Sequence, residues 1–237
     1  MNSDQKTHRR SFLGQMAGAV AAVSLPIASA RAAATEEAGA DEWIKEVKGA
    51  HRCLFDFPQH KNAMPLLHVL NYLNTYSAAY KTGPGQVGAV GTFYSAGPQA
   101  SIPLGFNDAM WAKYELGAYL KLKDASGVPY TRNVFNKPTQ KDLHLLMQAI
   151  ESPSIPALAD AVPMLGIENL QKMGAKFILC ANALGIWVLE LEARGKGKAS
   201  EIEQELRANL LPGVTIVPAM VIAIEKAQEA GIRYNRQ

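Results

Sequence analysis

Short apolar runs alternate along the chain with segments in which apolar residues recur at helical spacing. The run at 177–179 is too short for a helix and suits a strand that is buried on both faces. After it, Leu184, Trp187, Val188 and Leu191 fall on one face of a helix. Cys180 therefore lies where a predicted strand ends and a helix begins.

The same alternation continues from residue 52 to the end of the chain. Strands are predicted at 52–57, 87–94, 177–180 and 214–217. Helices are predicted at 64–80, from Asn107 or Asp108 to 119, near 142–150, around 158–173, from Cys180 to near Gly195, after a capping box of Ser200 and Glu203, and from Pro218 to Gly231. Strands separated by helices imply right-handed crossovers and a mainly parallel sheet with helices on both faces. The sequence thus predicts a three-layer α/β domain of flavodoxin-like type.

The first 34 residues have the pattern of an export signal. Arg9 and Arg10 are followed by one spacer and then Phe12 and Leu13, as in twin-arginine signals, and a mildly apolar stretch at 16–28 follows. That stretch is short and rich in Ala and Gly, so we expect no permanent membrane span, although an uncleaved anchor is the alternative. We expect cleavage near Ala33 and a folded protein in the periplasm.

The rest of the chain divides into a short polar segment and one domain. Residues 35–48 are expected to be a spacer or a short amphipathic helix, and residues 49–237 one α/β domain with a long, irregular insertion at about 96–174. The leader carries a net charge of +3, which equals that of the whole chain, so the mature protein is formally neutral. Neither a nucleic acid nor an anionic membrane surface is indicated as a partner.

The carboxyl ends of parallel strands meet at one edge of a sheet, where ligands bind in open α/β folds. Cys180 is the candidate catalytic residue there, because the free N–H groups of the following helix favour a thiolate. The alternative is that Cys180 is a small buried hydrophobic residue. The other residues placed near this edge form a candidate pocket: Asp56, Ser95, Asp108, Lys113 and Asn182.

Two of these pocket residues have further interpretations. Ser95 is an alternative nucleophile. Lys113 would support a thiolate at Cys180 if its loop folds over the edge, whereas Lys176 is expected to point away from the cysteine.

Several other patterns carry little functional weight. The stretch 83–88 matches G-x-G-x-x-G, but it follows a helix and opens a strand, so it is predicted to be a turn and no cofactor is expected. The histidines lack metal-ligand spacing, and a metal site would need His60 and His68 to approach each other. Cys53 lies within a strand, so we expect no disulfide with Cys180.

The segments 177–184, 211–218 and 227–234 resemble the DsrE/DsrF-like family, especially its exported members with twin-arginine leaders. Phe55, Asp56 and the stretch 108–111 are also similar to that family. The resemblance implies a flavodoxin-like fold, homo-oligomers that are often trimers or hexamers, and a sulfur-carrying or thiol partner. In the sulfur-relay members, the cysteine corresponding to Cys180 carries a persulfide.

Three functions follow as hypotheses. The first is an exported, oligomeric DsrE-like protein in which Cys180 handles sulfane sulfur or undergoes another thiol reaction. The second is a non-catalytic oligomeric module that binds a small ligand at the sheet edge and in which Cys180 is structural. The third, an electron carrier, is disfavoured because no phosphate-binding loop follows the first predicted strand.

Overall fold

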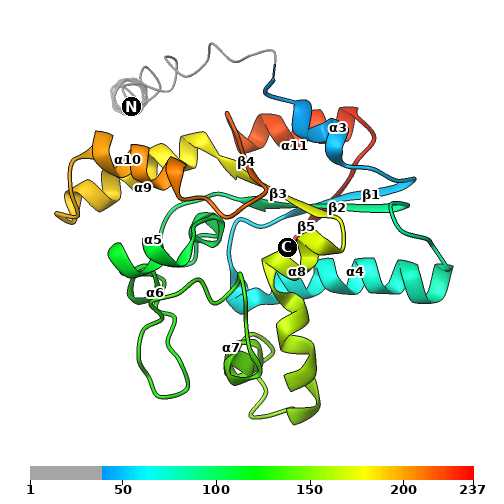
Figure 1. Ribbon diagram of the computed structural model, residues 1–237, viewed down its shortest axis with the longest axis horizontal. Coiled ribbons are helices and arrows are strands. Elements are labelled where there is room, and N and C mark those ends of the chain that lie inside the picture. The colour runs from blue at the N-terminus through cyan, green and yellow to red at the C-terminus, as the bar shows by residue number, and fades with distance from the viewer. Residues whose placement is uncertain (1–38) are drawn as a thin grey trace, which may run out of the picture. The chain divides into compact units, whose positions relative to one another are not determined.

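A parallel five-stranded sheet forms the middle layer of the computed structural model, which describes residues 39–237 (Figure 1). Its strands are β1 (His51–Asp56), β2 (Val87–Phe93), β3 (Ala175–Cys180), β4 (Val214–Val217) and β5 (Arg233–Arg236). They lie in the order β4-β3-β2-β1-β5, and each neighbouring pair is parallel. The predicted α/β class and the three-layer arrangement are confirmed.

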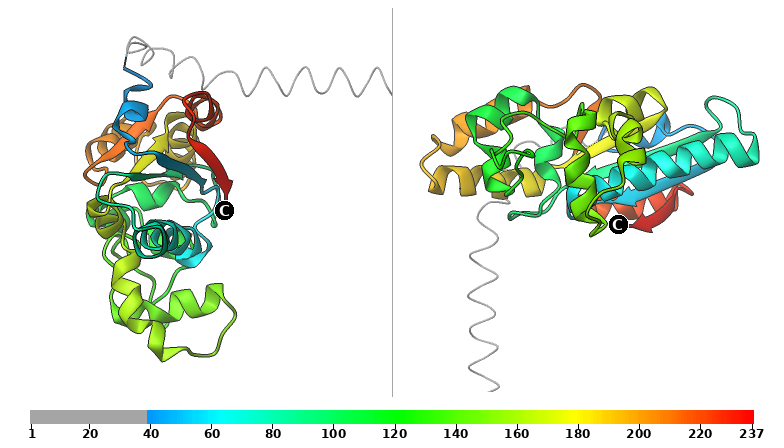
Figure 2. Two further views of the ribbon diagram at one scale, coloured as in Figure 1. Left: turned by 90° about the vertical axis from the view of Figure 1, so that its right-hand side faces the viewer. Right: turned by 90° about the horizontal axis from the view of Figure 1, so that it is seen from below.

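Helices cover both faces of this sheet. They are α3 (Glu42–Glu46), α4 (Met64–Tyr80), α5 (Asp108–Lys113), α6 (Leu116–Tyr119), α7 (Leu143–Ala149), α8 (Ile167–Lys172), α9 (Ala181–Ala193), α10 (Ala199–Ala208) and α11 (Met220–Glu229). Helices α4 and α8 lie on one side of the sheet, and α3 and α11 on the other (Figures 1 and 2). Helices α9 and α10 pack together beyond the carboxyl ends of the strands, where Figure 1 shows them at the left.

Aromatic side chains fill the face of the sheet that α4 covers. The rings of Phe93 and Phe177 stack with their centroids 5.1 Å apart, and Phe55 meets Tyr72 of α4 edge to face. Such pairs contribute about 0.5–1.5 kcal/mol beyond the area that they bury. Gly91 lies among these rings, and a Cβ there would be 2.6 Å from Phe177, so glycine lets the aromatic layer close over β2.

The opposite face of the sheet takes in part of the segment that was expected to be a spacer or a short amphipathic helix before the domain. Trp43 of α3 and the following Val47 are buried in the core. Gly88 of β2 admits this segment, because a Cβ at that position would be 2.5 Å from the carbonyl oxygen of Lys48. Residues from α3 onwards therefore belong to the domain, and apolar burial at Trp43 and Val47 is the physical reason.

Strand β5 is the one strand of the described part that the apolar pattern did not predict. All four of its residues are exposed, and it pairs only with β1, at the edge of the sheet. Its hydrogen bonds, rather than a buried face, hold it in place. The Tyr234 hydroxyl donates a hydrogen bond to the Asp56 carboxylate, and the backbone N–H of Gln237 donates one to the Asp56 carbonyl oxygen.

The predicted helix from 107 or 108 to 119 is broken into α5 and α6. Glu115, between them, has a left-handed backbone with φ of 52°. Asn107 is the N-cap, and its side chain accepts a hydrogen bond from the Met110 N–H over 3.2 Å. The predicted helical segment at 158–173 is a 3-10 helix over Pro156–Leu165 followed by α8.

The predicted capping box before α10 is wrong. That helix begins at Ala199 after Lys198, with no side-chain cap, and Glu203 forms an ion pair with Arg207 one turn later. Short 3-10 helices also occur at Lys61–Ala63, Ile102–Gly105 and Gln140–Asp142. The expected export signal lies outside the described residues. Within 39–237, no helix has both the length and the apolar character needed to cross a membrane.

Candidate functional site

Cys180 ends β3 at the carboxyl edge of the sheet and is the N-cap of α9. Its Sγ accepts one hydrogen bond from the Ala183 N–H over 3.4 Å and another from the Met220 N–H over 3.3 Å. Met220 is the first residue of α11, so the amino-terminal turns of two helices converge on one sulfur atom. Backbone donors and helix dipoles in this arrangement stabilise negative charge.

Cys53 has a different environment from Cys180. In the parallel ladders, Cys53 pairs with Ala89, and Ala89 pairs with Ala175. Ala175 and Cys180 are an odd number of residues apart on β3, so Cys53 and Cys180 point to opposite faces of the sheet. Strand β2 separates β1 from β3, which puts the two chains roughly 10 Å apart and out of reach of a disulfide. Both thiols are free, as expected. Burial raises the pKa of the Cys53 thiol to about 11, which makes it a poor nucleophile.

Asp56, a predicted pocket residue, is a buried carboxylate at the end of β1. One oxygen accepts a hydrogen bond from the Tyr234 hydroxyl over 2.8 Å, and the other from Thr92 Oγ1 over 3.3 Å. Burial, together with the Asp56 carboxylate, raises the pKa of the Tyr94 hydroxyl. By strand register, Asp56 lies beside Thr92, and Thr92 pairs with Ile178. Because Ile178 is two residues before Cys180 on β3, Asp56 and Cys180 lie on the same face of the sheet.

Tyr94 follows β2 at the same edge and was not singled out by the sequence. It directly follows Phe93, the last residue of β2, whose partner on β3 is Leu179, the residue before Cys180. Asp56, Tyr94 and Cys180 therefore lie at or just beyond the carboxyl ends of β1, β2 and β3. The available signal was positional, because Tyr94 ends the second predicted strand as Cys180 ends the third.

Ser95 and Asn182 lie at the same edge. Ser95 has a left-handed backbone with φ of 75°, and its carbonyl oxygen accepts a hydrogen bond from Trp187 Nε1 over 3.1 Å. This bond ties the loop after β2 to α9. Asn182 is an exposed residue in the first turn of α9, two residues after Cys180. The structure thus keeps these two predicted residues in the region of the candidate nucleophile.

Asp108 and Lys113 have partners of their own, so the structure does not place them over Cys180. Asp108 accepts a hydrogen bond from the Asn133 N–H over 2.9 Å and holds the long connection between β2 and β3. Lys113 forms an ion pair with Glu205 of α10 at 2.6 Å, because α10 brings that carboxylate alongside α5. Lys176 is paired with Glu46, so its side chain is also engaged away from the cysteine.

The two histidines considered for a metal have separate roles. His60 is buried; its Nδ1 accepts the Asn62 N–H over 3.1 Å, and its Nε2 faces the Pro98 carbonyl oxygen at 3.4 Å. Burial lowers the pKa of His60 to about 4. His68 instead contacts the side chain of Gln237. In residues 39–237 no cluster of three or more His, Cys, Asp or Glu side chains could hold a metal ion.

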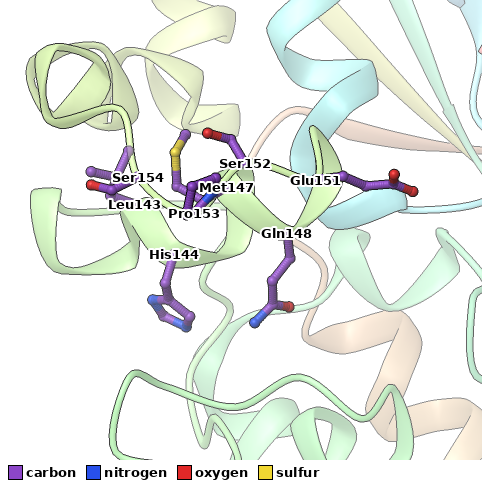
Figure 3. A pocket seen from close by; sticks show the side chains of 8 residues that line it. All are labelled: Leu143, His144, Met147, Gln148, Glu151, Ser152, Pro153 and Ser154. Carbon is purple, nitrogen blue, oxygen red and sulfur yellow. The ribbon is translucent and has the colours of Figure 1, made fainter.

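A surface hollow of about 530 Å³ lies away from the edge, beside α7 (Figure 3). Its lining is drawn from one short stretch of chain: Leu143, His144, Met147, Gln148, Glu151, Ser152, Pro153 and Ser154. His144 is held in part by the Lys123 carbonyl oxygen, 2.8 Å from Nε2. None of the predicted edge residues lines this hollow, so it is separate from Cys180.

Three comparisons with known proteins were made for the whole chain. No family model matches it, and neither the curated proteins nor the solved structures contain a match.

Proposed function

We propose that the protein carries sulfane sulfur on Cys180. The observation that carries this proposal is the pair of backbone N–H groups, from Ala183 and Met220, that donate to its Sγ. These donors stabilise an anionic sulfur, which is the form of cysteine that attacks other sulfur atoms. The resemblance of residues 177–184 to the DsrE/DsrF-like family supports the same function.

The reaction is a sulfur transfer without net oxidation. The Cys180 thiolate attacks the outer sulfur of a persulfide or polysulfide donor, and a new S–S bond forms. The S–S bond of the donor breaks, and its electron pair leaves with the rest of the donor, as a thiolate from a persulfide or as a shorter polysulfide from a polysulfide. Attack by an acceptor thiol on the outer sulfur of the Cys180 persulfide then returns Cys180 to its thiolate form.

The surroundings of Cys180 limit what can react there. The residue is only 5% exposed, since two helix ends and the sheet enclose it. Small inorganic or low-molecular-weight donors fit this burial better than a bulky disulfide, and access is one of the factors that control exchange rates. A buried, hydrogen-bonded sulfur also protects a persulfide from side reactions.

The proposal includes the cellular setting. Arg9 and Arg10 in the leader support export of the folded protein to the periplasm. Exposed apolar side chains on α9 and α11 support self-association, and the formally neutral mature chain offers little net charge repulsion against it.

Native-state alkylation distinguishes this function from a binding module with a structural cysteine. Full-length protein is treated with iodoacetamide near neutral pH, and each cysteine is assigned by peptide mass. We expect Cys180 to be labelled before Cys53, whose raised pKa keeps it protonated. Labelling of Cys180 only after unfolding would favour the binding module and overturn the sulfur-carrier proposal.

A further inference from the structure

The turn between β1 and α4 holds three consecutive residues in the left-handed backbone region. Lys61, Asn62 and Ala63 have φ of 38°, 48° and 76°. Asparagine adopts this region readily, but lysine and alanine do so only where their surroundings hold them there. We propose that His60 is a pH switch for this strained turn: its neutral imidazole holds the turn closed, and protonation of Nδ1 opens it.

Two hydrogen bonds define the protonation state in which the imidazole holds the turn. Nδ1 accepts the backbone N–H of Asn62 over 3.1 Å, so this nitrogen carries no proton. The proton is therefore on Nε2, which faces the Pro98 carbonyl oxygen at 3.4 Å. If Nδ1 also takes up a proton, two N–H groups face each other and the bond to Asn62 is lost. The middle residue of the strained turn then loses its side-chain anchor.

Burial makes the closed turn unfavourable for a charged ring. His60 is 1% exposed, and its ring packs beside that of Phe135, with the centroids 5.7 Å apart. The backbone of His60 is held as well, because its N–H donates to the Gln99 carbonyl oxygen over 2.9 Å. Burial lowers the pKa of His60 from 6.5 to about 4, so the closed turn is favoured above about pH 6.5 and loses this advantage as the pH falls towards 4.

The charged groups around the turn do not take part in this switch. Within residues 39–237, no charged side chain forms a hydrogen bond or an ion pair with His60. The segment 98–100, which lies against it, carries no titratable side chain. The titratable groups on the other segments near the turn are exposed or have partners of their own: Lys61, Lys141 and Glu151 are exposed, His68 contacts Gln237, Asp142 pairs with Arg132, Lys137 pairs with Glu168, and His144 lies against the Lys123 carbonyl oxygen.

The strained turn connects His60 to α7. The turn and α7 pack together, and Asn62 Nδ2 donates a hydrogen bond to Gln148 Oε1 over 3.4 Å. Gln148 is one of the residues that line the hollow beside α7 (Figure 3). Opening of the turn therefore frees a lining side chain of that hollow, which is the surface that mild acid changes.

Hydrogen exchange of the folded, full-length protein tests the switch locally. The N–H groups of residues 62–64 are protected while the turn is closed, because their acceptors belong to His60 and Lys61. Exchange is measured by mass at pH 7 and pH 5 in low urea, and each rate is corrected for the intrinsic rate at that pH. The lowered pKa of His60 predicts that the open population at 62–64 rises about twentyfold between pH 7 and pH 5.

Urea distinguishes opening of the turn from unfolding of the domain. A local opening exposes little surface, so exchange at 62–64 should be independent of low urea and faster than exchange in β2 and β3. Exchange at 62–64 that follows β2 and β3 in both rate and urea dependence would show that the turn opens only when the domain unfolds. That result would overturn the inference.

His60→Asn removes the titrating group from the turn. The asparagine side chain offers an acceptor close to the position of Nδ1, and it takes up no proton between pH 7 and pH 5. We expect the pH dependence of exchange at 62–64 to disappear in this variant. A pH dependence equal to that of the parent would assign the effect to another group and overturn the role of His60.

Lys61→Gly tests the strain without changing the imidazole, and it decides the outcome if His60→Asn does not fold. Glycine adopts the left-handed region without steric cost, so exchange at 62–64 at pH 5 should fall about two- to fivefold. Lys81→Gly is the matched control, because Lys81 is also exposed and left-handed, with φ of 57°, but lies at the other end of α4. It should leave exchange at 62–64 unchanged. No change in Lys61→Gly, or an equal change in both variants, would overturn the inference.

Discussion

The Met220 backbone N–H donates a hydrogen bond to the Sγ of Cys180 over 3.3 Å, across 40 residues of sequence. This bond joins the first turn of α11 to the end of β3, while the Ala183 N–H joins the same sulfur to α9. The Cys180 side chain thus accepts hydrogen bonds from two backbone N–H groups, one at each helix end, that have no partner within their own helices. The same bonds can hold a neutral thiol or an anionic sulfur, and the anion gains more from them.

Two glycines provide a matched pair of stability predictions. A Cβ at Gly117, in α6, would lie 2.1 Å from the carbonyl oxygen of Tyr130, so Gly117→Ala forces the backbone apart. We expect a loss of about 2 kcal/mol or more in the free energy of unfolding, measured by urea denaturation. Gly185, in α9, has no atom within 4 Å of such a Cβ. Gly185→Ala should therefore stabilise the protein by about 0.5–1 kcal/mol, and a loss there would contradict the account of α9.

From the burial of His60 we predict that the free energy of unfolding falls in mild acid. Its ordinary pKa of 6.5 is lowered to about 4 by burial, so the folded protein keeps His60 neutral while the unfolded chain takes up a proton. The stabilisation is complete above about pH 6.5 and is lost as the pH falls towards 4, by about 2–3 kcal/mol at pH 4.5.

Urea denaturation at pH 7 and pH 4.5 tests this effect of His60. His60→Asn should show a smaller difference between the two pH values than the parent, because no imidazole remains to be protonated. His68→Gln, which changes an exposed histidine, should keep the difference of the parent. Equal pH dependence in the parent and in His60→Asn would show that His60 contributes nothing to acid sensitivity.

The leader predicts dependence on the twin-arginine route. Replacing Arg9 and Arg10 together by lysine should leave the precursor in the cytoplasm, because the pair is the recognised part of such a signal. Fractionation and immunoblotting measure the distribution, and replacement of the nearby Lys6 by arginine is the control that keeps both arginines. Export that is unaffected by the double lysine variant would contradict the proposed route.

The exposed apolar residues predict self-association. Val221 and Ile222 on α11 are 75% and 52% exposed, and Ile186 and Leu189 on α9 are 52% and 46% exposed. We expect light scattering to report an oligomer at micromolar concentration, and Val221→Lys with Ile222→Lys to shift it towards monomer. Val128→Lys changes a comparably exposed residue outside these helices and should leave the mass unchanged. A monomeric parent protein would contradict the prediction.

Most of the fold follows from apolar patterns, and the exceptions have physical causes. Strands β1 to β4 are buried on at least part of their length, so each appears in the sequence as a short run of apolar residues. Strand β5 has no such run, because hydrogen bonds hold it at an exposed edge. The break between α5 and α6 lies at Glu115, and just beyond it Gly117 packs closely against the Tyr130 backbone, which is a tertiary contact. Local spacing carries no information on such a contact.

The site was only partly predictable for a similar reason. The position of Cys180 followed from one strand and one helix, which are neighbours in sequence. The Met220 donor and the partner of Lys113 depend on how distant helices pack. Asp56 lies at the end of its strand as predicted, but its hydrogen bond with Tyr234 depends on the place of β5 in the strand order.

The most direct test of the sulfur carrier is the intact mass of folded protein after brief exposure to inorganic polysulfide. The account predicts a gain of one sulfur atom, located on Cys180 by peptide mass, removed by a small thiol, absent from Cys180→Ser and retained in Cys53→Ser. Folded protein that gains no sulfur on Cys180, while the unfolded chain does, would contradict it.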